Sequence, residues 1–157
     1  MALIDQLAES IARFEGFFAP GSLAERNRNP GNLTWWGDRP TSGGYAVFDT
    51  VEQGWEALRR QIELNIGRGL TLREFFGGKV GVYPGYAPAA AGNDPESYAS
   101  FVAGRTGIPL DVPLVSVEPG SVEAAWLLPL STAGLPGWLL WVAIGGAAVV
   151  LALLFRR

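Results

Sequence analysis

The sequence predicts a mostly α-helical domain with a small irregular or β-hairpin insertion, followed by one C-terminal transmembrane helix. Three observations lead to this fold class. Apolar residues recur at steps of three and four over most of residues 1–114, which is the spacing of one face of a helix. Turn-forming residues interrupt that spacing over residues 27–48. An uncharged apolar run then fills residues 138–155.

Two long helices are predicted from their apolar stripes. The first lies near the N-terminus and carries Ile4, Leu7, Ile11, Phe14 and Phe18 on one face. The second begins after Thr50, which is followed three residues later by a glutamine, the spacing of a capping box. Gly67 or Gly69 is expected to end it, and its apolar face consists of Val51, Trp55, Leu58, Ile62 and Ile66.

Two further helices are predicted from their start signals. Thr71 and Glu74 have capping-box spacing, and two glycines soon stop the short helix that they begin. Asp94 precedes Pro95, a pair that suits the start of another helix. That helix is expected to turn Tyr98, Phe101 and Val102 toward the core. The segment 27–48, between the first two helices, is expected to hold a loop and a small β-hairpin.

The chain divides into three parts. Residues 1–114 form the folded domain, and residues 115–137, rich in Pro, Gly and Ser, form a linker. As a helix, residues 138–155 span roughly 27 Å, close to the hydrocarbon thickness of a bilayer. Trp138 and Trp141 lie at one end of this run, and Arg156 and Arg157 follow the other, as at membrane interfaces. We therefore expect a protein held in a lipid membrane by a single C-terminal anchor.

Composition excludes several kinds of chemistry. The chain has no Cys and no His, which excludes disulfides, Cys nucleophiles, Cys/His zinc sites and Ser-His-Asp triads. Acid–base chemistry falls to carboxylates, Tyr, Lys or the backbone. The 15 acidic and 12 basic residues form no basic cluster, so nucleic acid is not an expected partner. We also expect no cofactor and no metal.

Glu15 is the carboxylate that stands out. It lies in the run "FEGFF", about 20° around the helix axis from Ile4, at the edge of the apolar stripe. Partial burial disfavours a charged carboxylate and raises its pKa, which suits a general acid. Gly16 follows it, where a missing side chain leaves room for a ligand. The alternative is a structural glutamate paired with Arg13, Arg26 or Arg28.

Two further features accompany Glu15. In "NRNPGNL", Pro30 and Gly31 suit the centre of a type II turn, and Asn29 and Asn32 flank it, ready to bind backbone or ligand. Read alone, this stretch also fits an Asn-rich structural turn. Aromatic side chains pack against sugar rings as well as in cores, and this domain offers Trp35, Trp36, Tyr45, Tyr83 and Tyr86.

Taken in order, "IARFEGF", "NRNPGNL", "GGYAVF", "EQGWEAL", "GLTLREFF" and "YPGYAP…NDPESYASFVAGRTGIP" resemble lysozyme-like proteins of bacterial viruses. These are virion-associated muralytic proteins with an Asn-Pro-Gly-Asn motif, related to lytic transglycosylases. The similarity covers residues 4–114. It implies a lysozyme-like fold with a peptidoglycan cleft, Glu15 as the catalytic acid, and Asn29, Asn32, Tyr45 and Tyr86 as substrate-binding residues. The sequence departs from the motif at Arg28, where Asn is more usual.

The resemblance implies an enzyme of a virus particle that cuts MurNAc–GlcNAc bonds of peptidoglycan during entry, and the apolar run at residues 138–155 predicts that this enzyme is anchored in a membrane. Its expected partners are glycan strands, the virion membrane, and other membrane or capsid proteins of the particle. Two alternatives stay open: a non-catalytic structural or wall-binding protein of the particle, and a cellular wall-remodelling enzyme. The reaction also stays open. A hydrolase needs a second carboxylate, for which Asp38 and Asp49 are candidates, whereas a lytic transglycosylase needs Glu15 alone.

Overall fold

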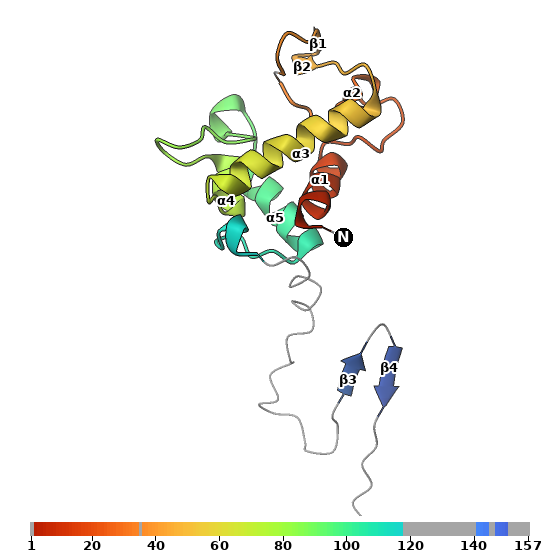
Figure 1. The fold of residues 1–157 in the computed structure, drawn as a ribbon, viewed down its shortest axis with the longest axis vertical. Coiled ribbons are helices and arrows are strands. Elements are labelled where there is room, and N and C mark those ends of the chain that lie inside the picture. Colours follow the sequence, from red (N-terminus) through yellow and green to blue (C-terminus); the bar gives the residue numbers. More distant parts are fainter. Residues whose placement is uncertain (1, 35, 118–140, 145–146, 151–157) are drawn as a thin grey trace, which may run out of the picture.

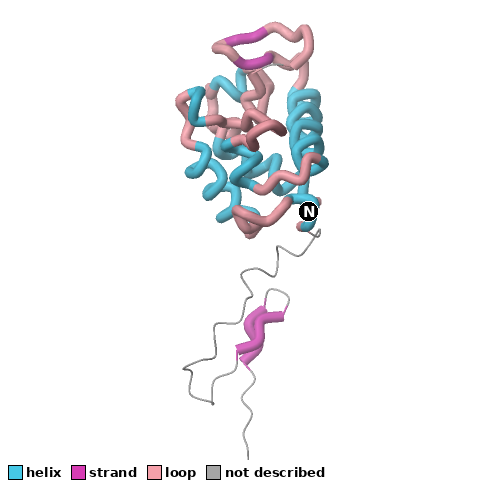
Figure 2. Tube along the Cα trace, turned by 90° about the vertical axis from the view of Figure 1, so that its left-hand side faces the viewer, coloured by secondary structure: helices cyan, strands magenta, loops and turns pink. Residues whose placement is uncertain are grey.

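A computed structural model describes residues 2–34, 36–117, 141–144 and 147–150, and Figures 1 and 2 show its fold. Residues 2–117 form a helical domain with a small β-hairpin. The α-helices in the described residues are α1 (Leu3–Phe14), α2 (Leu23–Arg26), α3 (Val51–Gly67), α4 (Leu72–Gly77) and α5 (Pro95–Thr106). Short 3₁₀ turns, η1 (Ala89–Ala91) and η2 (Leu114–Ser116), flank α5. The expectation of a mostly helical domain is confirmed.

The predicted helix starts are confirmed by their caps. Thr50 Oγ1 accepts a hydrogen bond from the N–H of Gln53 at the start of α3. At α4 the capping box is complete, because Thr71 and Glu74 each accept from the other's backbone N–H at 3.2 and 3.0 Å. Asp94 caps α5, whose first residue is Pro95. These signals act within three residues, which is why the sequence reveals them.

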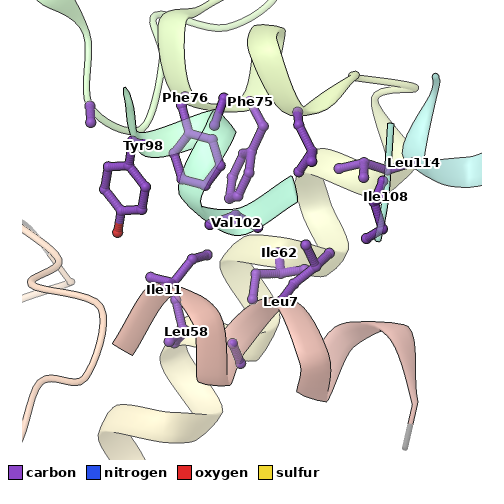
Figure 3. Close-up of a cluster of buried hydrophobic side chains, with 14 residues drawn as sticks. Leu7, Ile11, Leu58, Ile62, Phe75, Phe76, Tyr98, Val102, Ile108 and Leu114 are labelled. Atoms are coloured by element: carbon purple, nitrogen blue, oxygen red, sulfur yellow. The ribbon is translucent and has the colours of Figure 1, made fainter. Parts of the chain in front are cut away.

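The core lies where α1, α3, α4 and α5 meet (Figure 3). Helix α5 contacts both α1 and α4, and α1 also contacts α3. The largest fully buried side chains of this core include Leu7, Ile11, Leu58, Ile62, Phe75, Phe76 and Val102. Tyr98 lies at the edge of the cluster, with its hydroxyl pointing out of it (Figure 3). The core therefore presents one polar group to the neighbouring loop.

The predicted hairpin is present between α2 and α3. Strand β1 (Thr41–Ser42) pairs antiparallel with β2 (Tyr45–Ala46), with Ser42 opposite Tyr45. Both views place it at the end of the domain where α3 begins (Figures 1 and 2). A second, smaller cluster anchors it through Leu33, Ala46, Phe48 and Ala57.

Four residues of the predicted apolar faces are exposed instead, namely Phe14, Phe18, Val51 and Phe101. Helix α1 ends at Phe14 because Gly16 takes a left-handed φ of 73°, so Phe18 leaves the stripe and is 50% exposed. Phe18 packs with Phe17 and Trp55 in a separate surface group. Phe101 is 37% exposed, because it meets the edge of Phe14 outside the core.

The predicted transmembrane helix falls mostly outside the described residues. Where residues 138–155 are described, they differ from the expectation: β3 (Trp141–Ile144) and β4 (Ala147–Val150) form an antiparallel pair. Their valines and isoleucine are β-branched, a side-chain type that favours strands. No helix in the described part of the chain is both long and apolar enough to cross a bilayer. The predicted linker lies beyond the described residues from residue 118 onward.

Candidate active site

Glu15 occupies the C-terminal end of α1. Its backbone N–H still donates to the carbonyl of Ile11 at 2.9 Å, so the helix fixes the direction of the side chain. Gly16 then turns the chain with a positive φ of 73°, which a residue with a Cβ rarely adopts. A Cβ at Gly16 would meet no atom of the described residues within 4 Å. The turn explains the glycine, and the open space beside it is compatible with the expected room for a ligand.

Two neutral groups hold the Glu15 carboxylate. The side-chain Nδ2 of Asn32 donates to Oε2 at 2.8 Å, and the hydroxyl of Tyr98 donates to Oε1 at 2.7 Å. The three residues come from the end of α1, the loop before the hairpin, and α5. Each carboxylate oxygen thus has its own donor, and the group is fixed from two sides.

Burial dominates the electrostatics of Glu15. It raises the pKa of the carboxyl above its usual value, and the hydrogen bonds from Tyr98 and Asn32 offset only part of that rise. Within residues 2–34 and 36–117, no lysine or arginine forms an ion pair with it. Glu15 is therefore a half-buried carboxyl in a neutral setting, which favours its protonated form more than water does.

The alternative of a structural ion pair is not supported. Arg13 pairs with Glu9 on the exposed side of α1 at 2.7 Å. Arg26 donates to the carbonyl of Gly21, and Arg28 donates to the carbonyl of Phe48 at 2.9 Å. Each of the three candidate arginines is thus engaged elsewhere.

The Asn-Pro-Gly-Asn turn differs from the predicted type II turn. The N–H of Asn32 donates to the carbonyl of Asn29 at 3.0 Å, so a turn does form around Pro30 and Gly31. A type II turn requires positive φ at Gly31, but the positive φ values here belong to Arg28 and Asn32, at 52° and 44°. Gly31 is needed for space instead, because a Cβ there would lie 2.8 Å from Leu58 Cδ1.

Asn29 holds this loop in place. Its side chain is fully buried, and Nδ2 donates to the carbonyls of Leu33 and Ala46 at 3.0 and 2.9 Å. Its Oδ1 accepts from the N–H of Leu33 at 2.9 Å. The predicted contact of Asn29 with substrate has no support in this geometry, since its polar atoms are already bound to the backbone. Asn29 instead ties the loop to strand β2 and so positions Asn32.

Tyr98 is the site residue that sequence reasoning placed only in the core. Its ring stacks between Phe14 and Phe76, with ring centroids 3.9 and 4.2 Å away. Burial raises the pKa of its hydroxyl well above the usual value, so it stays a neutral donor. A tyrosine predicted to face a core needs a partner for its hydroxyl. The sequence could therefore have indicated that Tyr98 needs a hydrogen-bond partner, but not that this partner is Glu15.

Tyr86 lies beside the same loop and lines a pocket. Its hydroxyl, whose pKa burial raises well above the usual value, donates to the carbonyl of Gly31. With Asn32, Trp36 and Tyr83 it lines a pocket of about 500 Å³. Asn32 belongs both to this pocket and to the support of Glu15, whereas Glu15 itself does not line the pocket. Trp35 lies outside the described residues.

The remaining predicted residues lie apart from this group. Tyr45 is half-buried in strand β2, and it does not line that pocket. Asp49 is exposed and pairs with Arg39 at 2.9 Å, and Asp38 is also exposed. Neither aspartate hydrogen-bonds to Glu15 or to its two donors in the described residues.

Comparison of the chain with protein-family models, with curated proteins and with solved structures gives no match. The chemistry of the site is therefore argued from its geometry. A carboxyl with a raised pKa and two neutral partners, beside a loop whose residues also line an aromatic pocket, can give a proton to a bound ligand and take one back.

Proposed function

We propose that this chain cleaves the glycan strands of peptidoglycan, with Glu15 as general acid and then general base. The observation that carries the proposal is the carboxyl of Glu15, half-buried, held by Asn32 and Tyr98, and without a cationic partner among the described residues. A purely structural carboxylate gains most from a cation beside it. A general acid gains from a setting that keeps its proton near neutral pH.

The proposed reaction is that of a lytic transglycosylase. Protonated Glu15 gives its proton to the glycosidic oxygen, and the bond from that oxygen to C1 of the muramyl residue breaks. The 6-hydroxyl of the same sugar then attacks C1, and ionised Glu15 takes the hydroxyl proton. The products are a 1,6-anhydro end and a free 4-hydroxyl, no water is consumed, and Glu15 is again protonated.

A hydrolase is the alternative reaction. An inverting hydrolase needs a second carboxylate as base, roughly 6.5–9.5 Å from the acid, and a retaining one needs a closer nucleophile. The ion pair of Asp49 with Arg39 favours a structural role for Asp49. Mass spectrometry of the products separates the reactions, because an anhydro end weighs one water less than a reducing end. Reducing ends alone, with an inactive Asp38 or Asp49 variant, would favour the hydrolase.

The pocket beside Asn32 supports a carbohydrate substrate. Trp36, Tyr83 and Tyr86 offer aromatic surface there, and Gln61 adds a polar group. Sugar sites combine aromatic faces that pack against the rings with a few polar groups that fix their orientation. The order of motifs that resembles lysozyme-like muralytic proteins points to peptidoglycan as that sugar polymer.

We also place the protein in a membrane, as part of a virus particle. The support is the uncharged run at residues 138–155, with tryptophans at its start and arginines after its end. An anchored enzyme would confine wall cleavage to the point of entry. The full chain should float with lipid vesicles in a density gradient, and a chain ending at Val117 should not. Full-length protein that stays monomeric in buffer without lipid or detergent would contradict the anchor.

Zymography on purified peptidoglycan tests the catalytic proposal. Glu15→Gln keeps size and polarity but cannot cycle a proton, so activity should fall roughly 10²–10⁴-fold. Glu9→Gln is the matched control, because Glu9 is a half-exposed carboxylate on the same helix that pairs with Arg13 and not with the groups around Glu15. Equal lysis by wild type and Glu15→Gln would refute the catalytic role. Binding to sacculi without lysis by the wild type would favour the wall-binding alternative.

A further inference from the structure

The side chains of Asn29 and Asn32, which flank the same turn, differ in how many of their polar atoms are hydrogen-bonded. Asn29 has both its Nδ2 and its Oδ1 bound to backbone groups, so its amide has one possible orientation. Asn32 binds only through Nδ2, which donates to Glu15 Oε2 at 2.8 Å. Its Oδ1 is buried and has no hydrogen-bond partner among the described residues. The orientation of the Asn32 amide is therefore decided by Glu15 alone.

Asn32 carries two costs that an ordinary structural residue avoids. A buried acceptor without a donor costs about 1–3 kcal/mol. Its backbone also has a left-handed φ of 44°, which is unfavourable for a residue other than glycine, although Asn tolerates it better than most. Such costs concentrate at functional sites. The chain accepts both at the residue that touches the carboxyl.

We propose that the side-chain amide of Asn32 turns by half a rotation as Glu15 gains and loses its proton. An ionised carboxylate only accepts hydrogen bonds, so Nδ2 faces it. A protonated carboxyl has an O–H that needs an acceptor, and the half-turn brings Oδ1 to the same place. Because Oδ1 has no other bond, the turn breaks only the contact with Glu15, which Oδ1 then remakes as an acceptor.

This inference rests on the proposed function, in which one carboxyl acts as acid and then as base. A donor fixed in one orientation stabilises only the ionised form and so depletes the protonated form of Glu15 that begins the reaction. A turning amide supports both forms, which is what a single carboxyl with two duties needs. Asn32 is thus a positioning residue for Glu15.

The other groups facing Glu15 do not supply this switch by changing charge. Tyr98 faces Glu15 from α5. Tyr86, in the loop after α4, is also near, and the negative charge of Glu15 contributes to the raised pKa of Tyr86. Both phenols stay neutral because burial raises their pKa values well above the usual one. The nearby cation Arg13 is paired with Glu9.

NMR of the full chain in detergent micelles tests the turn without requiring activity. With ¹⁵N-labelled Asn and ¹³C-labelled Glu, a scalar coupling across the hydrogen bond joins Asn32 Nδ2 to Glu15 Cδ. We expect the coupling while Glu15 is ionised and its loss once Glu15 is protonated. Asn29, whose amide is locked, should keep its side-chain signals throughout. A coupling that persists in both protonation states would overturn the proposal.

The pH dependence of lysis gives a second readout. Asn32→Gly removes the amide and accepts the left-handed backbone without strain. If Asn32 serves both forms of Glu15, activity should fall about tenfold across the whole pH profile, which keeps its position. A profile that only moves to higher pH would indicate a fixed donor and overturn the inference. Absence of lysis by the wild type would refute the proposed function and leave the NMR result to decide the turn.

Discussion

The hydrogen bond from Tyr98 to Glu15 is the contact whose removal is most informative. Tyr98→Phe deletes one oxygen and leaves the ring in its stack between Phe14 and Phe76. A hydrogen bond to a charged group is worth about 1.5–3 kcal/mol. Since 1.4 kcal/mol is a factor of ten, the ratio of ionised to protonated Glu15 at a given pH should fall roughly 10- to 150-fold.

The direction of the change in the Glu15 pKa depends on whether the Tyr98 hydroxyl stabilises the ionised or the protonated carboxyl. Tyr98 donates to the carboxylate, so its loss raises the pKa of Glu15 further above the usual value. The alkaline limb of lysis activity should move to higher pH, and ¹³C NMR of the Glu15 carboxyl should titrate at higher pH. Without the Tyr98 hydroxyl, Glu15 still carries the proton that it donates in the first step. The ionised Glu15 of the second step loses one of its two hydrogen-bond donors.

Tyr83→Phe is the matched control for this experiment. Its hydroxyl interacts with Gln61 at 3.1 Å rather than with Glu15, so the pKa of Glu15 should stay where it is. An unchanged Glu15 titration in a folded Tyr98→Phe protein would refute the reasoning, because it would mean that the hydroxyl does not stabilise the carboxylate.

Three further predictions concern stability. Asn29→Ala leaves buried backbone groups without partners and should lower the free energy of unfolding in urea by about 2–5 kcal/mol. The control Asn93→Ala changes an exposed residue and should lower it by less than about 0.5 kcal/mol. Gly54→Ala places a Cβ against the carbonyl oxygen of residue 28 and should destabilise α3 and the loop beside it. Gly67→Ala meets open space among the described residues and should stabilise the protein by about 0.5–1 kcal/mol. Equal effects of the two variants in thermal unfolding would contradict this packing. Because the pKa of Glu15 is raised on folding, its contribution to stability is present below its unfolded pKa and is lost as pH rises through the folded pKa. The unfolding free energy of wild type relative to Glu15→Gln should therefore fall as pH rises from the unfolded pKa of Glu15 through its higher folded pKa, and a rise would indicate a lowered pKa.

The sequence by itself determined those parts of the fold that depend on residues adjacent in the chain. Thr50, Thr71 and Asp94 begin helices through side chains that reach a backbone N–H three residues away. The hairpin follows in the same way from its glycines and extended residues. Glu15 also stood out locally, because a carboxylate at the edge of an apolar stripe needs a reason.

The tertiary structure decided what surrounds that carboxylate. Tyr98 is 83 residues away in the chain and Asn32 is 17 away, so only the packing of α5 and the loop against the end of α1 brings them to Glu15. The two asparagines of one turn look alike in sequence. Packing separates them, because the amide of Asn29 meets three backbone groups and that of Asn32 meets one carboxylate. Helix starts depend on a few adjacent residues, whereas the partners of a buried polar group depend on which distant segments share the space around it.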